Sequence, residues 1–243
     1  MQNLIACLQF ITILPVGKTA EFNPGGIIRA FPLAGLVLGL IIALFDTVAI
    51  HVWPVPVVSV LDVVLLVILS GGFHMDGLAD TADGLYGQRS REKALLIMKD
   101  SRVGAMGLCA VVCVFAVKWA GVGHLDQGRF LWLLIIPAYA RSSMIFGIRY
   151  LSYARGKEGT GSRFFEQPVT GSHFMFMVIP VVLSLFLGMS GILLNIIFLL
   201  MNFVLIGYYR KKMGGITGDM LGAMTEVMEA GLFLVAAAGG VLC

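Results

Sequence analysis

Long apolar runs, separated by short polar loops, make up most of the chain. A helix needs about 20 mainly apolar residues to cross the hydrocarbon core of a bilayer, and about seven runs approach that length. The run that begins at Phe174 is short, and the run that begins at Val57 contains Asp62. The expected spans are Phe31–His51, Val57–Phe73, Val103–Gly123, Phe130–Leu151, Phe174–Gly188, Ile192–Tyr209 and Met220–Leu242. The pattern predicts an all-α, polytopic integral membrane bundle that forms a single domain over residues 1–243.

The segment before the first span has a different character. Residues from Met1 to Leu14 are mixed in polarity and end at Pro15. They lack the basic start and the small-residue cleavage site of a removable signal peptide. We therefore expect a short interfacial helix that lies along the lipid surface.

Composition agrees with a membrane protein. The chain is 58% hydrophobic and only 13% charged, and its mean hydropathy is +0.93. Ordinary soluble domains are far less apolar. The net charge of +3 comes from the loops between spans and forms no basic stripe, so nothing predicts binding to nucleic acid.

Lysines and arginines are gathered on one side of the predicted bundle. If seven spans are threaded in order, fourteen of the seventeen basic residues fall in loops on the side of the amino terminus. These are Lys18, Arg29, Arg89, Arg91, Lys93, Lys99, Arg102, Arg149, Arg155, Lys157, Arg163, Arg210, Lys211 and Lys212. Because basic loops stay in the cytoplasm, we expect a cytoplasmic amino terminus and an external carboxyl terminus.

Three aspartates follow the second predicted span in helical register. Asp76, Asp80 and Asp83 stand at positions i, i+4 and i+7, within an arc of roughly 60° on a helix. Three carboxylates on one strip repel one another unless a cation lies among them. Oxygen ligands of this kind suit Mg²⁺, which shares its other positions with water and phosphate oxygens. The strip therefore predicts a magnesium site with Asp76, Asp80 and Asp83 as ligands.

Two further polar motifs are expected on the same side of the membrane. The run from Lys99 to Gly104 contains Asp100 and Arg102, and the glycine-rich run from Gly214 to Gly222 contains Asp219. The loops on the opposite side are short and chemically plain. A channel or carrier would place polar groups at mid-membrane with access from both sides. The one-sided distribution favours a membrane-embedded enzyme that acts on cytosolic substrates.

Several polar residues allow two interpretations. His74 adjoins the strip and would bind phosphate, shuttle a proton, or simply end a helix with a hydrogen bond. Charges inside spans usually face the interior of a bundle. Glu226 and Glu229 lie three residues apart in the last predicted span, and Arg141 lies in another span. Glu226 would extend the site or pair with Arg141; we favour the site, and leave Glu229 open.

The aspartate motif resembles two families to different degrees. Its spacing is partly similar to that of enzymes that transfer a phospho-alcohol from a CDP-activated lipid, but that family has Ala-Arg where this chain has Ala79-Asp80. The run from Gly71 to Gly84, Gly-Gly-Phe-His-Met-Asp-Gly-Leu-Ala-Asp-Thr-Ala-Asp-Gly, closely resembles the signature of the cobalamin synthase family. The likeness extends to Phe10–Pro15, Phe31–Gly35, Met98–Gly104 and Gly214–Asp219, and to Glu226 and Glu229.

This resemblance implies a specific reaction. Enzymes of the cobalamin synthase family (adenosylcobinamide-GDP ribazoletransferases) are polytopic inner-membrane proteins that require Mg²⁺. They join adenosylcobinamide-GDP to α-ribazole, or to its 5′-phosphate, and release GMP. Two alternatives remain open: a CDP-alcohol-type membrane phosphotransferase, and a small transporter whose aspartates bind a coupling cation. The sequence does not decide whether the chain forms a homo-oligomer.

The resemblance and the residue pattern together suggest a set of roles. Asp76, Asp80 and Asp83 hold Mg²⁺ on the pyrophosphate. The phosphates and the departing GMP are bound by Arg89, Lys99 and Arg102, with Glu226 at the same site. A carboxylate, Asp100 or Asp219, takes the proton of the attacking ribose hydroxyl, and His74 is a further catalytic candidate.

Overall fold

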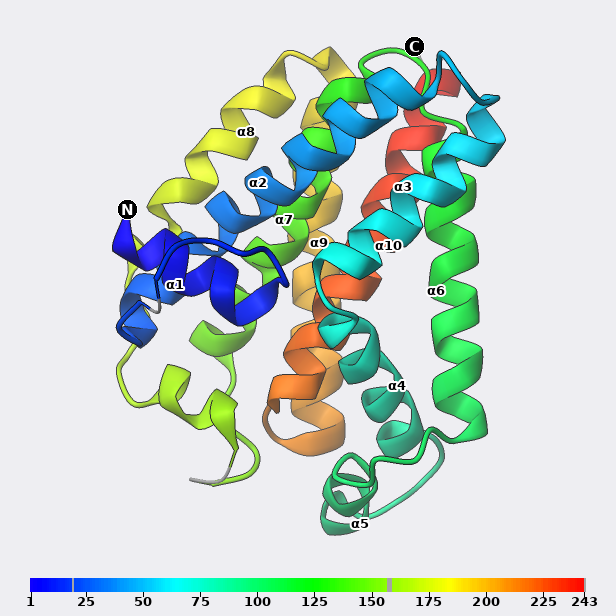
Figure 1. The fold of residues 1–243 in the computed structure, drawn as a ribbon. Coiled ribbons are helices and arrows are strands. Elements are labelled where there is room, and N and C mark those ends of the chain that lie inside the picture. Colours follow the sequence, from blue (N-terminus) through cyan, green and yellow to red (C-terminus); the bar gives the residue numbers. More distant parts are fainter. Residues whose placement is uncertain (19, 157–158, 243) are drawn as a thin grey trace.

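A computed structural model describes residues 1–18, 20–156 and 159–242, so the predicted charge at Lys157 lies outside the described part. Within these ranges the regular elements are helices, together with one isolated parallel bridge between Tyr153 and Ile216 (Figure 1). The predicted all-α class is confirmed.

The helices follow the order of the predicted spans, with short elements between them. They are α1 (Gln2–Ile11), α2 (Pro24–Ala49), α3 (Val55–Leu69), α4 (Phe73–Leu85), α5 (Arg91–Ile97), α6 (Ala105–Gly123), α7 (Arg129–Tyr150), η1 (Thr160–Phe165), η2 (Gly171–Met177), α8 (Val178–Leu185), α9 (Gly188–Met213) and α10 (Gly218–Leu242). Among the described residues, five of these are long and apolar enough to cross a membrane: α2, α6, α7, α9 and α10. The chain is therefore a multi-pass membrane protein.

Two of the seven predicted spans differ from this picture. The expected span Val57–Phe73 ends early, because α3 and α4 meet at a bend of 89°; if the bent pair is one span, the count rises to six. The expected span Phe174–Gly188 is built from the 3₁₀ helix η2 and the short helix α8. A 3₁₀ helix rises about 2.0 Å per residue, so η2 and α8 together reach roughly 26 Å, close to the thickness of the hydrocarbon core. Figure 1 shows α8 running up to the top of the bundle before α9 returns in the opposite direction, and η2 is the part of this segment that packs on α2.

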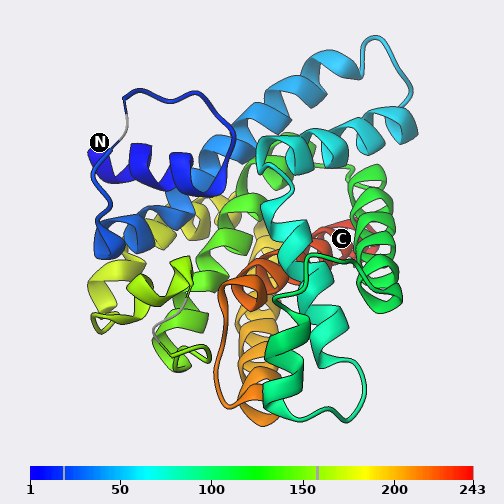
Figure 2. The ribbon, with the colours of Figure 1, turned by 60° about the horizontal axis from the view of Figure 1, so that its bottom comes forward.

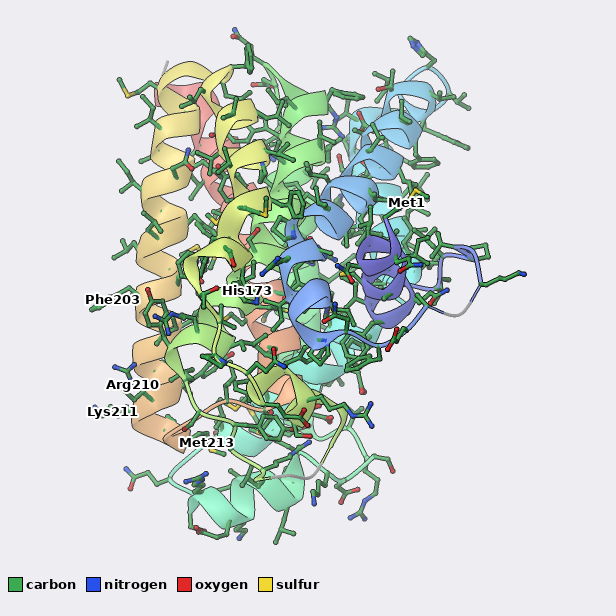
Figure 3. All side chains as sticks on the ribbon, turned by 90° about the vertical axis from the view of Figure 1, so that its left-hand side faces the viewer. Met1, His173, Phe203, Arg210, Lys211 and Met213 are labelled. Atoms are coloured by element: carbon green, nitrogen blue, oxygen red, sulfur yellow. The ribbon has the colours of Figure 1, made fainter. Side chains whose placement is uncertain are left out.

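The centre of the bundle is formed by α7 and α10. Of their most apolar stretches, 83% and 72% of the residues are buried within the molecule, against 22% for α6 and for α9. The backbone of α2 lies very close to α7, since a Cβ on Gly39 would stand 2.1 Å from the carbonyl oxygen of Leu134. Figure 3 shows Phe203 of α9 pointing away from the protein, and its side chain is 77% exposed. Side chains of this kind form the surface that faces lipid.

The two ends of the bundle carry different charges. Arg210 and Lys211 extend from the lower end of α9 (Figure 3), the end that also holds α5 and the loop into α10. At the opposite end, Arg129 pairs with Asp46 at 2.6 Å and with Asp62 at 3.3 Å. Asp62, the charge that interrupts the second predicted span, thus belongs to an ion cluster that ties α2, α3 and α7 together.

Candidate active site

The bend between α3 and α4 sets the direction of the aspartate strip, in which Asp76 is exposed and Asp80 and Asp83 are half-buried. Gly71 and Gly72 have φ values of +62° and +69°, a left-handed conformation that side chains disfavour, and α4 begins directly after them. A straight continuation of α3 would have carried the strip in a direction 89° away from the one that α4 takes. The turn instead lays α4 against the lower half of α10 (Figures 1 and 2).

Small residues set the distance between α4 and α10. A Cβ on Gly77 would stand 2.7 Å from the carbonyl oxygen of Asp219, and a Cβ on Gly222 would stand 3.2 Å from the Cα of His74. No larger side chain fits between the two backbones. The first turn of α10 is therefore held against the second turn of α4, and Asp219 lies beside the strip.

Three carboxylates and one guanidinium form an acidic cluster at this contact. The charges that act on Asp80 are those of Asp76, Asp219, Arg155 and Asp83. Arg155 approaches Asp219 to 2.7 Å. The contact is an ion pair without good hydrogen-bond geometry, because Oδ2 of Asp219 and Nε of Arg155 are buried without a hydrogen-bond partner in the described part of the chain. We call Asp76, Asp80, Asp219 and Arg155 the acidic cluster.

The loop after α7 delivers Arg155 to the cluster. Ala154 donates its N–H to the carbonyl of Ile216, and Ile216 donates to the carbonyl of Ser152, both at 2.9 Å. Arg91 of α5 donates to the carbonyl of Ala154 at 3.0 Å. Arg155 itself donates to the carbonyl of Met98 at 3.2 Å. The three loops at this end of the bundle thus hold one another in place around the cluster.

Asp83, the third member of the predicted metal strip, has another task in the structure. Its two carboxylate oxygens accept hydrogen bonds from the N–H groups of Gly104 at 2.7 Å and Gly107 at 2.9 Å, at the start of α6. A carboxylate in this position satisfies N–H groups that the helix leaves unpaired. Both oxygens of Asp83 are occupied, so in the structure Asp83 caps helix α6. Its role as a metal ligand stays a prediction.

Three predicted residues near α5, Arg89, Asp100 and Arg102, have partners outside the acidic cluster. Arg102 donates to Asp100 through Nε and Nη2, at 2.9 and 2.6 Å, and these hydrogen bonds lower the pKa of Asp100 to about 2. A carboxylate of such low pKa is a weak proton acceptor. Arg89 is exposed and donates to the carbonyl of Asp83 at 2.7 Å, and Lys99 is exposed. Of the two predicted bases, only Asp219 stands among the carboxylates of the strip.

His74 lies away from the strip. Its side chain is fully buried, and neither ring nitrogen has a hydrogen-bond partner among the described residues. Its neighbours include Phe73, with ring centroids 5.8 Å apart, and the small cavity lined by Phe31 and Phe164, and the buried charges of Arg141, Glu229 and Lys118 also act on it. Since α4 turns by about 200° between residues 74 and 76, His74 faces away from Asp76.

Glu226 pairs with Lys118 and not with Arg141, the partner that the sequence offered as the alternative to a place in the site. Lys118 of α6 contacts both Glu226, at 2.5 Å, and Glu229, while Arg141 of α7 contacts Glu229. All four side chains are 2% exposed or less. Two cations and two anions form a neutral set that joins α6, α7 and α10 inside the bundle. Glu226 stands about 10 Å along α10 from Asp219, so its contacts are those of a structural residue.

Comparison with known proteins identifies the family. A sequence model described as cobalamin-5-phosphate synthase matches residues 3–237. The chain belongs to the cobalamin-5-phosphate synthase family. The resemblance read from the aspartate motif is therefore confirmed, and the chain is an enzyme of the cobalamin synthase type.

Relatives of known name support this membership over nearly the whole chain. An adenosylcobinamide-GDP ribazoletransferase of Chlorobaculum tepidum is 35% identical over 245 residues, which cover 98% of this chain and 95% of the relative. Proteins of the same name from Listeria monocytogenes (34%, covering 92% of each chain) and Clostridium acetobutylicum (31%, covering 94% of this chain and 92% of the relative) are also similar. No solved structure matches the chain.

The sequence analysis assigned no role to two charged residues that form ion pairs in the structure, Arg155 and Lys118. Arg155 was counted only as a loop charge, although a single arginine in a glycine-rich segment facing Asp219 is a candidate anion ligand. Lys118 lies within the expected span Val103–Gly123. A buried lysine in lipid requires a partner, and that requirement predicts an acidic neighbour such as Glu226.

Asp83 offers a test that separates capping from metal binding. Replacing Asp83 by Ala should lower stability by about 0.5–2 kcal/mol, as loss of a helix cap does, and Asp83→Asn should keep most of it. The measurement is thermal unfolding in detergent, with Asp76→Ala as the control that leaves α6 capped. If Asp83→Asn melts like the wild type but has no activity, the residue acts on the metal as first predicted.

The buried ion set gives a second prediction. Lys118→Met should destabilise the bundle by about 3–5 kcal/mol, because two buried carboxylates are left with one cation. Adding Glu226→Gln makes the buried ion set neutral again. The double variant should regain more than half of the decrease in melting temperature that Lys118→Met causes. The exposed Lys93→Met in α5 is the matched control. An unchanged melting curve for Lys118→Met would contradict the pairing.

Proposed function

We propose that the chain transfers the phosphocobinamide group of adenosylcobinamide-GDP to α-ribazole or its 5′-phosphate, producing adenosylcobalamin or its 5′-phosphate and GMP. The relatives' names supply the reaction. The acidic cluster is the observation that links this reaction to specific residues. In it α4, α10 and the loop after α7 bring together Asp76, Asp80, Asp219 and Arg155.

The cluster fits a magnesium ion that also binds phosphate. Its donors are carboxylates, the ligands that Mg²⁺ prefers, and Oδ2 of Asp219 beside them is buried and paired with Arg155 at 2.7 Å. In the described part of the chain no three acidic, histidine or cysteine side chains stand close enough to enclose a metal alone. Mg²⁺ commonly takes one or two carboxylates and completes its shell with substrate phosphate and water. Asp76 and Asp80 would hold it, and when bound it would neutralise charge that develops on the pyrophosphate.

The remaining residues supply binding and proton transfer. Arg155 has a buried Nε without a partner and is placed to donate to a phosphate oxygen of the substrate. The ribose hydroxyl oxygen of α-ribazole attacks the phosphorus that bears cobinamide, the bond from that phosphorus to GMP breaks, and GMP leaves. Asp219 accepts the hydroxyl proton, since Asp100 is held by Arg102.

The site's orientation follows from charge. The acidic cluster lies at the end of the bundle that carries Arg210 and Lys211. By the positive-inside rule this end faces the cytoplasm, and the carboxyl terminus lies outside. The membrane in question is the inner membrane of a bacterial cell. The cytoplasm is where a nucleotide-activated substrate would be available.

Removing carboxylates of the cluster tests the proposal. Asp80→Asn and Asp76→Asn should each lower the rate of GMP release by about a thousandfold, because several kcal/mol of transition-state stabilisation are lost. The assay uses purified protein with adenosylcobinamide-GDP, α-ribazole and Mg²⁺, and Asp126→Asn at the opposite end is the control. Near-normal rates in both cluster variants would refute the site. Activity only with a CDP-activated lipid would refute the reaction.

Orientation has its own test. Single cysteines at Gln127 and Ser190 should react with a membrane-impermeant reagent added outside spheroplasts. Cysteines at Ser90, Gly159 and Lys212 should react only after the membrane is opened. External labelling at Gly159 would place the cluster on the wrong side of the membrane for a cytosolic nucleotide.

A further inference from the structure

A large polar pocket lies beside the acidic cluster, between the end of α7 and η1. Its volume is about 860 Å³, and its walls include Arg149, Ser152, Tyr153, Arg163, Phe165 and Glu166. Ligand pockets typically measure roughly 300–1,000 Å³. Neither the predicted site nor the reaction proposed above uses these residues.

Tyr153 is a wall shared by the pocket and the cluster. It stands two residues before Arg155, and the charges of Arg155 and Asp219 both act on its ring hydroxyl. On the other side a Cβ on Gly161 would lie 3.3 Å from the Tyr153 ring and 3.5 Å from the Cα of Gly218. A molecule in the pocket therefore lies next to the position at which Arg155 would bind a phosphate.

The pocket combines three kinds of group. The rings of Tyr153 and Phe165 lie 5.1 Å apart and present an aromatic surface. Arg149 and Arg163 contact the aromatic rings of Tyr150 and Phe22 and provide positive charge. Glu166 is exposed and forms no ion pair or hydrogen bond within the part of the chain that the structure describes. Aromatic surface, arginine and an unpaired carboxylate are the elements that recognise a purine nucleotide.

We propose that this pocket binds the guanosine half of the nucleotide-activated substrate, with Glu166 selecting guanine. The proposal rests on the proposed function. A carboxylate accepts two hydrogen bonds from guanine, from N1–H and from the 2-amino group. Adenine offers no such pair, and the dimethylbenzimidazole of α-ribazole has no N–H at all. The guanine would stack on Phe165, and the 5′-phosphate would point past Tyr153 to Arg155 and the acidic cluster.

Binding of the product nucleotide tests this without a transfer reaction. Equilibrium binding of GMP, IMP and AMP is measured on the purified full-length protein in detergent with Mg²⁺. The wild type should bind GMP most tightly and IMP less tightly. Its affinity for AMP should be lower than its affinity for GMP by about tenfold or more. Glu166→Gln should weaken GMP by about tenfold and leave AMP unchanged. Phe165→Ala should weaken the binding of all three nucleotides. Glu92 is an exposed acid outside the pocket, and Glu92→Gln should leave the binding of all three unchanged.

The outcomes separate this proposal from the proposed function. If Glu166→Gln keeps the wild-type preference for GMP while the wild type still releases GMP in the transfer assay, the pocket assignment fails alone. If the Glu166 and Phe165 variants lose affinity for α-ribazole and keep that for GMP, the pocket belongs to the acceptor and the proposal is overturned. If the wild type releases no GMP from adenosylcobinamide-GDP, the proposed function fails.

Discussion

The close contact of α4 with α10 is the constraint on which the site depends. Gly77 and Gly222 remove the side chains that would separate the two backbones, so that Asp219 is brought against the strip of α4. The charges of Asp76 and Asp219 act on Asp80 and disfavour its charged form. Arg155 offsets part of this effect through its ion pair with Asp219. The protein therefore holds a set of negative charges that a metal and a phosphate ligand would complete.

The bend that precedes α4 is possible because its backbone remains hydrogen-bonded. In lipid an unpaired N–H or carbonyl costs several kcal/mol, so an interrupted helix must be covered by protein. Gly71 and Gly72 donate to the carbonyls of Ile68 and Val67, and Ile13 donates to that of Leu69 at 2.9 Å. The segment after α1 thus closes the break. The amino-terminal helix contributes to the site by supporting the turn that sets the direction of the aspartate strip.

Deeper in the bundle, a neutral ion set holds the same helices from within. Lys118, Arg141, Glu226 and Glu229 join α6, α7 and α10, and each charge has a partner of opposite sign. Buried pairs of this kind add little net stability but strongly disfavour any arrangement that separates them. They therefore fix how α10 is rotated, and through α10 they fix the direction of Asp219. The site at one end depends on charges that substrate never contacts.

The sequence by itself determined the class, the family and the helical register of the aspartates. Apolar run length, charge distribution and the spacing of Asp76, Asp80 and Asp83 are local properties, and local properties can be read along the chain. Tertiary structure decided which carboxylates meet. Asp83 caps α6, Asp219 replaces it in the cluster, Arg155 arrives from a distant loop, and Glu226 pairs with Lys118. Each of these contacts joins residues at least 20 positions apart, and only the packing of helices sets such distances.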